Sequence, residues 1–258
     1  MKIVISPAKK MQTDGGFLPK SQPVFLDQAE ELWSYLHSLD QAGLEKVWRA
    51  NAKITEEARQ MLAADLTQPQ VPALFAYSGL QYQYLAADVL DQAGLDYLDQ
   101  HLRVLSGLYG SLRPFDGIVP YRLEMKSPLP AFKYKSLYEF WGEKVYQELY
   151  QDDSVVLNLA SKEYSHLLTP FLKEGDRLLE VVFQEEKNGK WRTQATHAKM
   201  ARGRLVRWLA EGGRDLSDLP GFTDFGYAFA PDQSGEDRVV FRKNDNFSQS
   251  EKKKKLHF

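Results

Sequence analysis

The chain has 258 residues, of which 43% are hydrophobic and 26% charged, and a formal net charge of −2. This composition can bury one large core and excludes a chain that is disordered throughout. Because there is no cysteine, disulfide partners, iron–sulfur clusters and thiolate zinc sites are excluded, which fits a reducing compartment. No apolar run is long enough for a signal peptide or a membrane span, so we expect a soluble cytoplasmic protein without a membrane partner.

The expected elements begin with a buried strand at 3–5, which leads into a loop that carries Lys9. Apolar spacing and capping residues predict helices over 27–38, 42–50, 55–64, 93–105, 137–149, 161–168 and 197–211. Strands are predicted over 73–77, 155–159, 177–185, 191–196, 227–230 and 238–242, with a hairpin at Asn188-Gly189. This irregular alternation predicts an α/β (mixed α+β) fold, in which a mixed sheet is surrounded by helices in a single compact domain over 1–243.

Charge is distributed unevenly along the chain. Asp88, Asp91, Asp96 and Asp99 make an acidic stretch, whereas 187–214 holds eight Lys or Arg against the single acid Glu211, a local charge of +7. Such local asymmetry favours an anionic partner even when the whole chain is nearly neutral. Residues 244–258 are polar and include the lysines 252–255, and we expect them to form a disordered basic tail.

A two-glycine turn flanked by arginines follows the predicted helix 93–105. Leu98, Leu102 and Leu105 recur at helical spacing, so we expect the helix to end near Ser106. Gly107 and Gly110 would then take positive φ and expose N–H groups beside Arg103 and Arg113, as in a helix-hairpin-helix element that binds phosphates. The alternative is an ordinary helix C-cap followed by a stop at Pro114.

The predicted helix 197–211 carries an apolar stripe and several cations. Lys199 and Arg202 lie three apart beside the stripe, and Arg204 and Arg207 lie three apart on another side. Gly203 would leave room next to Arg202 for a phosphate backbone. The alternative is the charged outer face of an amphipathic helix.

Several short segments, in the same order along nearly the whole chain, resemble the bacterial peroxide-stress protein YaaA family. They are Ile5-Ser6-Pro7-Ala8-Lys9, Pro120-Tyr121-Arg122-Leu123-Glu124-Met125-Lys126, 137–142, 157–164, 186–190 and 197–203. The chain departs from the family pattern at Met200, where a second basic residue would follow Lys199, and in its extra tail.

This resemblance implies a cytoplasmic protein that is linked to limiting free iron during hydrogen-peroxide stress. It also implies similarity to a member that binds double-stranded DNA through a helix-hairpin-helix and a basic cleft. We therefore expect peroxide-stress protection with binding of double-stranded or distorted DNA at low sequence preference. The expected nucleic-acid-binding residues are Arg103, Gly107, Gly110, Arg113, Arg122, Lys199, Arg202, Arg204 and Arg207.

The sequence contains no familiar motif for a metal site or for nucleophilic catalysis. The five histidines are scattered without the spacing of a zinc helix, and neither a nucleophile elbow nor a phosphate loop is present, so we expect no metal and no cofactor. An effect on iron would then be indirect.

One group of residues still permits an enzyme. Asn158 lies at the end of a predicted strand, Lys162 and Glu163 follow it, and Lys9 follows another strand. These residues could therefore line a crevice at the carboxyl end of the sheet. A buried Lys9 beside Glu163 would suit acid–base or Schiff-base chemistry on a small phosphorylated or nucleobase substrate. Alternatively, Ser161 simply caps a helix, with Glu163 in its first turn. A third hypothesis is a scaffold whose basic face meets an acidic protein.

Overall fold

The computed structural model describes residues 1–14, 16–68 and 71–243, so the expected tail over 244–258 lies outside the described residues. The main sheet contains β1 (Lys2–Ile5), β5 (Leu102–Ser106), β6 (Gly110–Leu112), β8 (Val155–Asn158), β9 (Arg177–Lys187), β10 (Lys190–Arg192), β11 (Ala228–Phe229) and β12 (Arg238–Lys243). Its order is β11-β12-β9-β8-β1-β5-β6, with β10 paired to β9. The mixed sheet is therefore confirmed.

Two small two-stranded sheets stand beside the main one, β2 (Lys10–Met11) with β4 (Tyr77–Ser78) and β3 (Val71–Pro72) with β7 (Gly117–Ile118). The helices are α1 (Leu26–Ser38), α2 (Gln41–Trp48), α3 (Ala52–Arg59), α4 (Ala73–Ala76), α5 (Leu80–Leu85), α6 (Gln92–His101), α7 (Leu137–Trp141), α8 (Lys144–Tyr150), α9 (Lys162–Ser165) and α10 (Ala195–Gly212). Short 3-10 helices cover 60–63, 87–89, 169–171, 216–221, 224–226 and 231–233.

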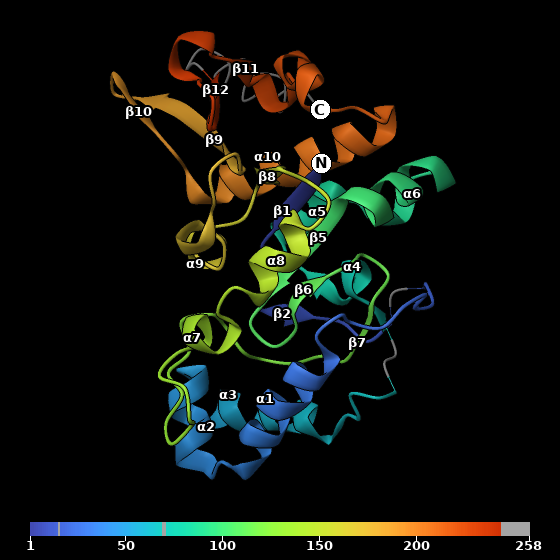
Figure 1. Cartoon of the computed structure of the whole chain (residues 1–258), viewed down its shortest axis with the longest axis vertical. Helices are drawn as coiled ribbons and strands as arrows, with labels where there is room; N and C mark the ends of the chain where they lie inside the picture. Colours follow the sequence, from blue (N-terminus) through green and yellow to red (C-terminus); the bar gives the residue numbers. More distant parts are fainter. Residues whose placement is uncertain (15, 69–70, 244–258) are drawn as a thin grey trace, which may run out of the picture.

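Helices surround the sheet, as expected from its apolar strands. Helix α6 packs on β1 and β5, α10 on β9 and α8 on β8. Helices α1, α2 and α3 form the end of the molecule that lies away from β10, β11 and β12 (Figure 1). Among the described residues, we find no helix with the length and hydropathy that a membrane span requires.

The order of the parallel strands reverses at β1. Strand β1 pairs in parallel with β5 on one side and with β8 on the other, and β8 continues in parallel to β9 and β12. The chain thus builds the sheet toward β5 first and then returns to the other side of β1. In an open α/β sheet, the loops that leave two such strands at their carboxyl ends diverge and leave a crevice between them. That crevice lies after Ile5 and Asn158.

The helix expected over 93–105 is wrong in its last turn. Helix α6 ends at His101, and Leu102–Ser106 forms β5, every residue of which is buried. A continuous apolar run of this length fits a strand buried on both faces as well as it fits a helix, and here β1 provides the partner. The arginine-flanked glycines therefore join two antiparallel strands, β5 and β6, and the expected helix-hairpin-helix is a β-hairpin over 102–112.

Other sequence-based boundaries shift for local reasons. The strand expected over 73–77 is mostly helix α4, which follows Pro72. The helix expected from Thr55 begins three residues earlier, because the Asn51 side chain accepts a hydrogen bond from the N–H of Ile54. Helix 137–149 is interrupted at Gly142, which has a φ of +50°. The Asn188-Gly189 hairpin and the last antiparallel pair are confirmed.

The turn between β5 and β6 is buried and supports a neighbouring segment. Gly110 has the expected positive φ of +70°, whereas the positive φ expected for Gly107 is wrong. A Cβ on Gly110 would lie 2.8 Å from the ring of Trp141. A Cβ on Gly107 would lie 2.4 Å from the carbonyl oxygen of Leu123. The Gly107 carbonyl accepts a 3.0 Å hydrogen bond from the Trp141 indole. This turn therefore holds the backbone around Leu123 in place.

We expect Gly107→Ala to lower the free energy of unfolding by about 2 kcal/mol or more, because the methyl group would overlap the backbone at Leu123. The matched control is Gly235→Ala, where nothing lies within 4 Å of an added Cβ and the change should stay within about 0.5 kcal/mol. Urea unfolding of both variants measures the difference. Equal stability of the two variants would contradict this packing.

Candidate nucleic-acid interface

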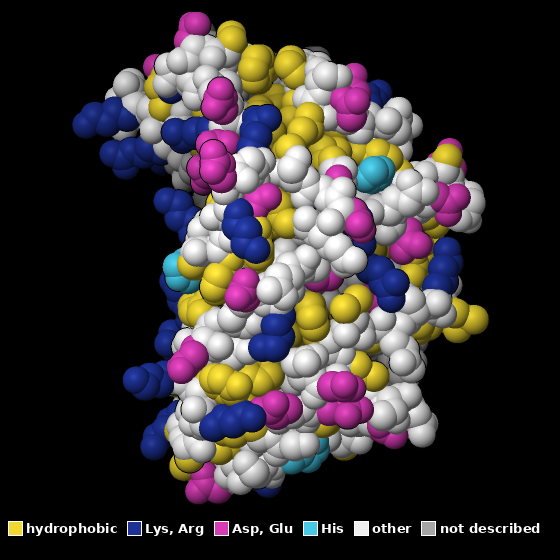
Figure 2. Space-filling model, in the orientation of Figure 1, with side chains coloured by type: hydrophobic (Ala, Val, Ile, Leu, Met, Phe, Trp, Pro, Cys, Tyr) yellow, Lys and Arg dark blue, Asp and Glu magenta, His cyan; other side chains and the backbone are white. Residues whose placement is uncertain are grey.

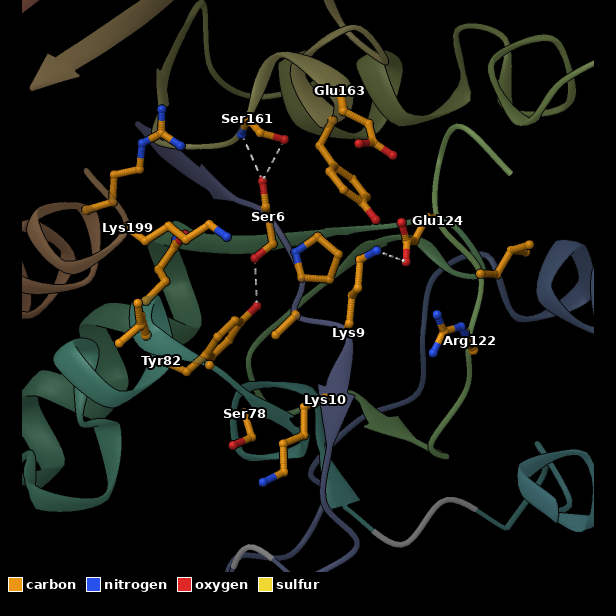
Figure 3. Close-up of a pocket in the computed structure, with 18 of the residues that line it drawn as sticks. Ser6, Lys9, Lys10, Ser78, Tyr82, Arg122, Glu124, Ser161, Glu163 and Lys199 are labelled. Carbon is orange, nitrogen blue, oxygen red and sulfur yellow. Dashed lines mark hydrogen bonds and ion pairs between the residues drawn. The ribbon is translucent and has the colours of Figure 1, made fainter. Parts of the chain in front are cut away.

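A cavity of about 580 Å³ opens at the point where β1 and β8 end. Five segments line it: the residues after β1, the start of α5, the 121–124 segment, the residues after β8, and α10. Figure 3 shows that the loop after β1 crosses the middle of this view, with Ser6 and Lys9 side by side. We call this cavity of about 580 Å³ the Lys9 cavity. It occupies the crevice expected from the reversal of strand order.

A serine pair holds the two strand ends together. The backbone N–H of Ser161 donates a 2.8 Å hydrogen bond to Ser6 Oγ, and the Ser6 hydroxyl donates to Ser161 Oγ at 3.3 Å (Figure 3). The Tyr82 hydroxyl donates to the Ser6 carbonyl at 3.0 Å and so ties in α5. Ser161 occupies the N-cap position of α9, but its side chain makes no capping hydrogen bond. The expected N-cap position of Ser161 is confirmed, but its side chain pairs with Ser6 and does not cap the helix.

Five cationic side chains line the Lys9 cavity, against the two carboxylates of Glu124 and Glu163. The cations are Lys9, Lys10, Arg122, Lys199 and Arg202. Lys9 Nζ lies 2.8 Å from Glu124 Oε1 and its side chain is 69% exposed. Lys199 and Arg122 lie on opposite sides of this ion pair (Figure 3). The cavity is therefore a cationic site with one internal counterion pair.

Two of these cations carry buried N–H groups without a protein partner. The Nε atoms of Arg122 and Arg202 are inaccessible to solvent and have no hydrogen-bond partner among the described residues. Burial lowers the pKa of the Arg202 guanidinium, although the nearby Glu180 carboxylate acts in the opposite direction. An arginine remains protonated under cellular conditions. A buried guanidinium donor without a partner is costly, so this arrangement favours an anionic ligand that accepts from it.

The residues proposed for catalysis divide between two cavities. Lys9 and Glu163 line the Lys9 cavity, whereas Asn158 and Lys162 line a separate cavity of about 460 Å³. Asn158 Oδ1 accepts a 3.0 Å hydrogen bond from the N–H of Ala160. Because Lys9 is exposed and paired with Glu124, the buried Lys9 expected beside Glu163 is wrong.

Most of the arginines expected to bind phosphates have intramolecular partners. Arg103 lies 3.1 Å from Glu148, Arg113 lies 3.0 Å from Asp116, Arg204 lies 2.7 Å from Asp224, and Arg207 lies 2.6 Å from Glu211. Of the expected set, Arg122, Lys199 and Arg202 line the cavity.

Gly203 brings α10 close to α5. A Cβ on Gly203 would lie 2.1 Å from the carbonyl oxygen of Gln81, so the space expected to admit a phosphate backbone is filled by α5. This close approach places Arg202 next to Gln81 on the wall of the cavity.

Sequence reasoning missed Lys10, Ser6, Tyr82 and Glu124. Ser6 lies within the 5–9 segment, Lys10 follows it directly, and Glu124 lies within the 120–126 segment. The sequence does not show that Lys9 pairs with Glu124. Tyr82 carried no signal because its role depends on the approach of α5 to β1. Within 1–14, 16–68 and 71–243, no three His, Asp or Glu side chains form a group suited to a metal ion.

The Arg103–Glu148 pair serves stability, because both side chains are at most 15% exposed. We expect Arg103→Ala to lower the free energy of unfolding by about 3 kcal/mol, since the Glu148 carboxylate would stay buried without its partner. Arg207→Ala, which breaks a more exposed pair with Glu211, should cost about 1 kcal/mol or less. Chemical unfolding compares the two variants. A larger loss for Arg207→Ala would contradict the assignment.

The family model described as "Peroxide stress protein YaaA" matches residues 1–233. The chain is 99% identical over 243 residues to a "UPF0246 protein" of Lactobacillus delbrueckii subsp. bulgaricus, which covers 94% of this chain and 99% of the relative. A "UPF0246 protein" of Lactobacillus johnsonii is 51% identical over 246 residues, covering 94% of this chain and 98% of the relative. One from Lacticaseibacillus casei is 45% identical over 244 residues, covering 93% and 99%. The chain therefore belongs to the peroxide stress protein YaaA family, which supports a role in peroxide stress.

Proposed function

We propose that this protein protects cells from peroxide by binding double-stranded or distorted DNA in the cytoplasm, with low sequence preference, through phosphate contacts at the Lys9 cavity. The observation that carries the proposal is that Arg122 and Arg202 each have a buried Nε without a hydrogen-bond partner in the described part of the chain. Both residues line a cavity that Lys199 and Lys10 also line. Guanidinium groups bind phosphate oxygens in a planar, charge-assisted geometry. Such contacts position a nucleic-acid strand without reading its bases.

The surface around the cavity supports an extended anionic partner. Lys and Arg side chains gather along one edge of the molecule, from the β9–β10 hairpin to the end that carries α2 (Figure 2). The outline of the molecule is concave along the middle of this edge. A polyanion that follows this edge would neutralise several cations at once, which a small ligand confined to the cavity cannot do.

Family membership further leads us to propose a link to limiting free iron. The test compares chelatable iron in peroxide-treated cells that carry the wild-type protein or a variant with Arg122, Lys199 and Arg202 changed to Ala. We expect higher free iron with the variant if DNA binding and iron limitation belong to one activity. Equal chelatable iron in both strains would show that DNA binding and iron limitation are separate activities.

The same triple variant tests DNA binding itself. We expect duplex affinity to fall steeply with salt for the wild type, and the slope of log affinity against log salt to flatten by about three in the variant, near 0.9 for each lost phosphate contact. Fluorescence anisotropy with a labelled duplex across a salt series measures both slopes.

The matched control replaces three exposed cations outside the Lys9 cavity, Lys53, Lys173 and Arg238, by Ala. It removes the same formal charge and should leave the slope within one unit of the wild type. An unchanged slope in the folded cavity variant would remove Arg122, Lys199 and Arg202 from the interface.

A second candidate function is an enzyme acting on a small phosphorylated or nucleobase substrate. The observation that favours it is the volume of about 580 Å³, which lies within the range of about 300–1,000 Å³ that small-molecule sites occupy. Lys9 and Glu163 line this cavity and would exchange protons with the substrate.

The Lys9–Glu124 ion pair separates the two functions. If the protein binds DNA, Lys9→Met should weaken duplex binding, because it leaves the Glu124 carboxylate uncompensated beside the phosphates. Adding Glu124→Gln should restore most of the affinity, and peroxide survival should follow affinity in both variants. Loss of survival in both variants with normal duplex affinity would instead support the enzyme and contradict our proposal.

A further inference from the structure

Three of the residues that line the Lys9 cavity carry a buried donor without a hydrogen-bond partner among the described residues. Besides Arg122 Nε and Arg202 Nε, the Nε2 atom of Gln81 is inaccessible and unpartnered, and Gln81 is only 7% exposed. Phosphate contacts account for the two guanidinium groups. A neutral amide is not needed for phosphate binding, so Gln81 points to a second polar feature of the ligand, an uncharged acceptor.

The same cavity has a wall of tyrosines. Tyr82, Tyr121 and Tyr164 line it, and none is more than 7% exposed. The Tyr121 hydroxyl is hydrogen-bonded to the hydroxyls of Ser106 and Tyr77 at 2.7 Å each. Burial raises the pKa of Tyr121 to about 12 and raises those of Tyr82 and Tyr164 as well, so all three stay neutral. Neutral rings in a fixed position suit a flat, uncharged ligand ring.

Planar ring, neutral acceptor and phosphate together describe a nucleotide. A base that is paired in a duplex cannot enter a cavity of about 580 Å³, because its pairing partner and its stacked neighbours would have to enter with it. A single nucleotide that has left the stack has the size of the ligands that such cavities hold. Proteins that bind a single base of a duplex displace it from the helix in this way.

We propose that the Lys9 cavity receives one nucleotide displaced from the base stack of distorted DNA. The base lies among Tyr82, Tyr121 and Tyr164 and accepts a hydrogen bond from Gln81, and its phosphate binds Arg202 and Arg122. This inference rests on the proposed DNA binding. Because displacing a base costs least when it is unpaired, the cavity selects bulged or mismatched sites over regular duplex without reading their sequence.

The experiment compares three labelled DNA probes by fluorescence anisotropy at one salt concentration: a fully paired duplex, the same duplex with one extra unpaired adenine, and that bulge with an abasic residue in place of the adenine nucleotide. We expect binding to the adenine bulge to be at least tenfold tighter than to the paired duplex. The abasic bulge should lose most of that preference, because it bends the DNA equally but offers no ring.

Gln81→Met keeps the volume of the side chain and removes the amide. We expect it to reduce the ratio of adenine-bulge affinity to abasic-bulge affinity by threefold or more. Gln83→Met is the matched control, because Gln83 lies on the same helix but is exposed, and the ratio should stay at the wild-type value. Thermal unfolding confirms that both variants fold.

The outcomes separate this inference from the proposed function. Salt-dependent binding of all three probes with equal affinity would overturn the nucleotide site and leave DNA binding intact. No binding to any probe would overturn both. Deoxyadenosine monophosphate serves as a competitor. If it removes the bulge preference only at concentrations far above the dissociation constant of the bulged DNA, the result supports a displaced DNA nucleotide as the ligand. Tight, Gln81-dependent binding of the free nucleotide without any bulge preference would overturn DNA as its source.

Discussion

The reversal of strand order at β1 is the constraint on which the rest of the structure depends. Parallel pairing on both sides of β1 sends the loops after Ile5 and Asn158 apart, and the Ser6–Ser161 hydrogen bonds keep them from separating further. The Lys9 cavity follows from these two facts. Its cations come from segments far apart in the chain, which the fold brings to the end of β1.

The buried β5–β6 hairpin contributes to the site indirectly. Gly107 approaches the carbonyl oxygen of Leu123, and the neighbouring Arg122 and Glu124 thereby face the cavity from a segment without regular secondary structure. The glycines and arginines of this hairpin drew attention in the sequence as direct phosphate ligands. In the structure, Arg103 and Arg113 instead neutralise buried or half-buried carboxylates.

Much of the fold could be predicted from the sequence, because apolar runs, caps and the Asn188-Gly189 turn act locally. The helix over 26–38 and the strands at 2–5 and 155–158 agree with their patterns to within a residue or two. Leu102–Ser106 was predicted wrongly because its apolar spacing satisfies helix and strand alike, and only pairing with β1 decides between them.

The residues of the site could be predicted in part, but their partners could not. Arg122, Lys199 and Arg202 could be named from charge and family resemblance, and Lys9 from its place after the first strand. Which arginines have internal partners depends on contacts between distant segments, such as Arg103 with Glu148 or Arg204 with Asp224. No local pattern reports those contacts, so sequence reasoning overestimated the number of free cations.

The close approach of α10 to α5 at Gly203 also affects how much freedom a ligand must remove on binding. With the helix backbones in contact, Arg202 and Gln81 are carried by one rigid block, and Tyr82 on α5 is anchored to the end of β1. Ligand binding then orders little in this part of the site, and the conformational entropy lost there is small. The exposed side chains of Lys9, Lys10 and Lys199 lose more. The entropic cost of assembling the site therefore falls mainly on its exposed lysines, and the block of α5 and α10 adds little to it.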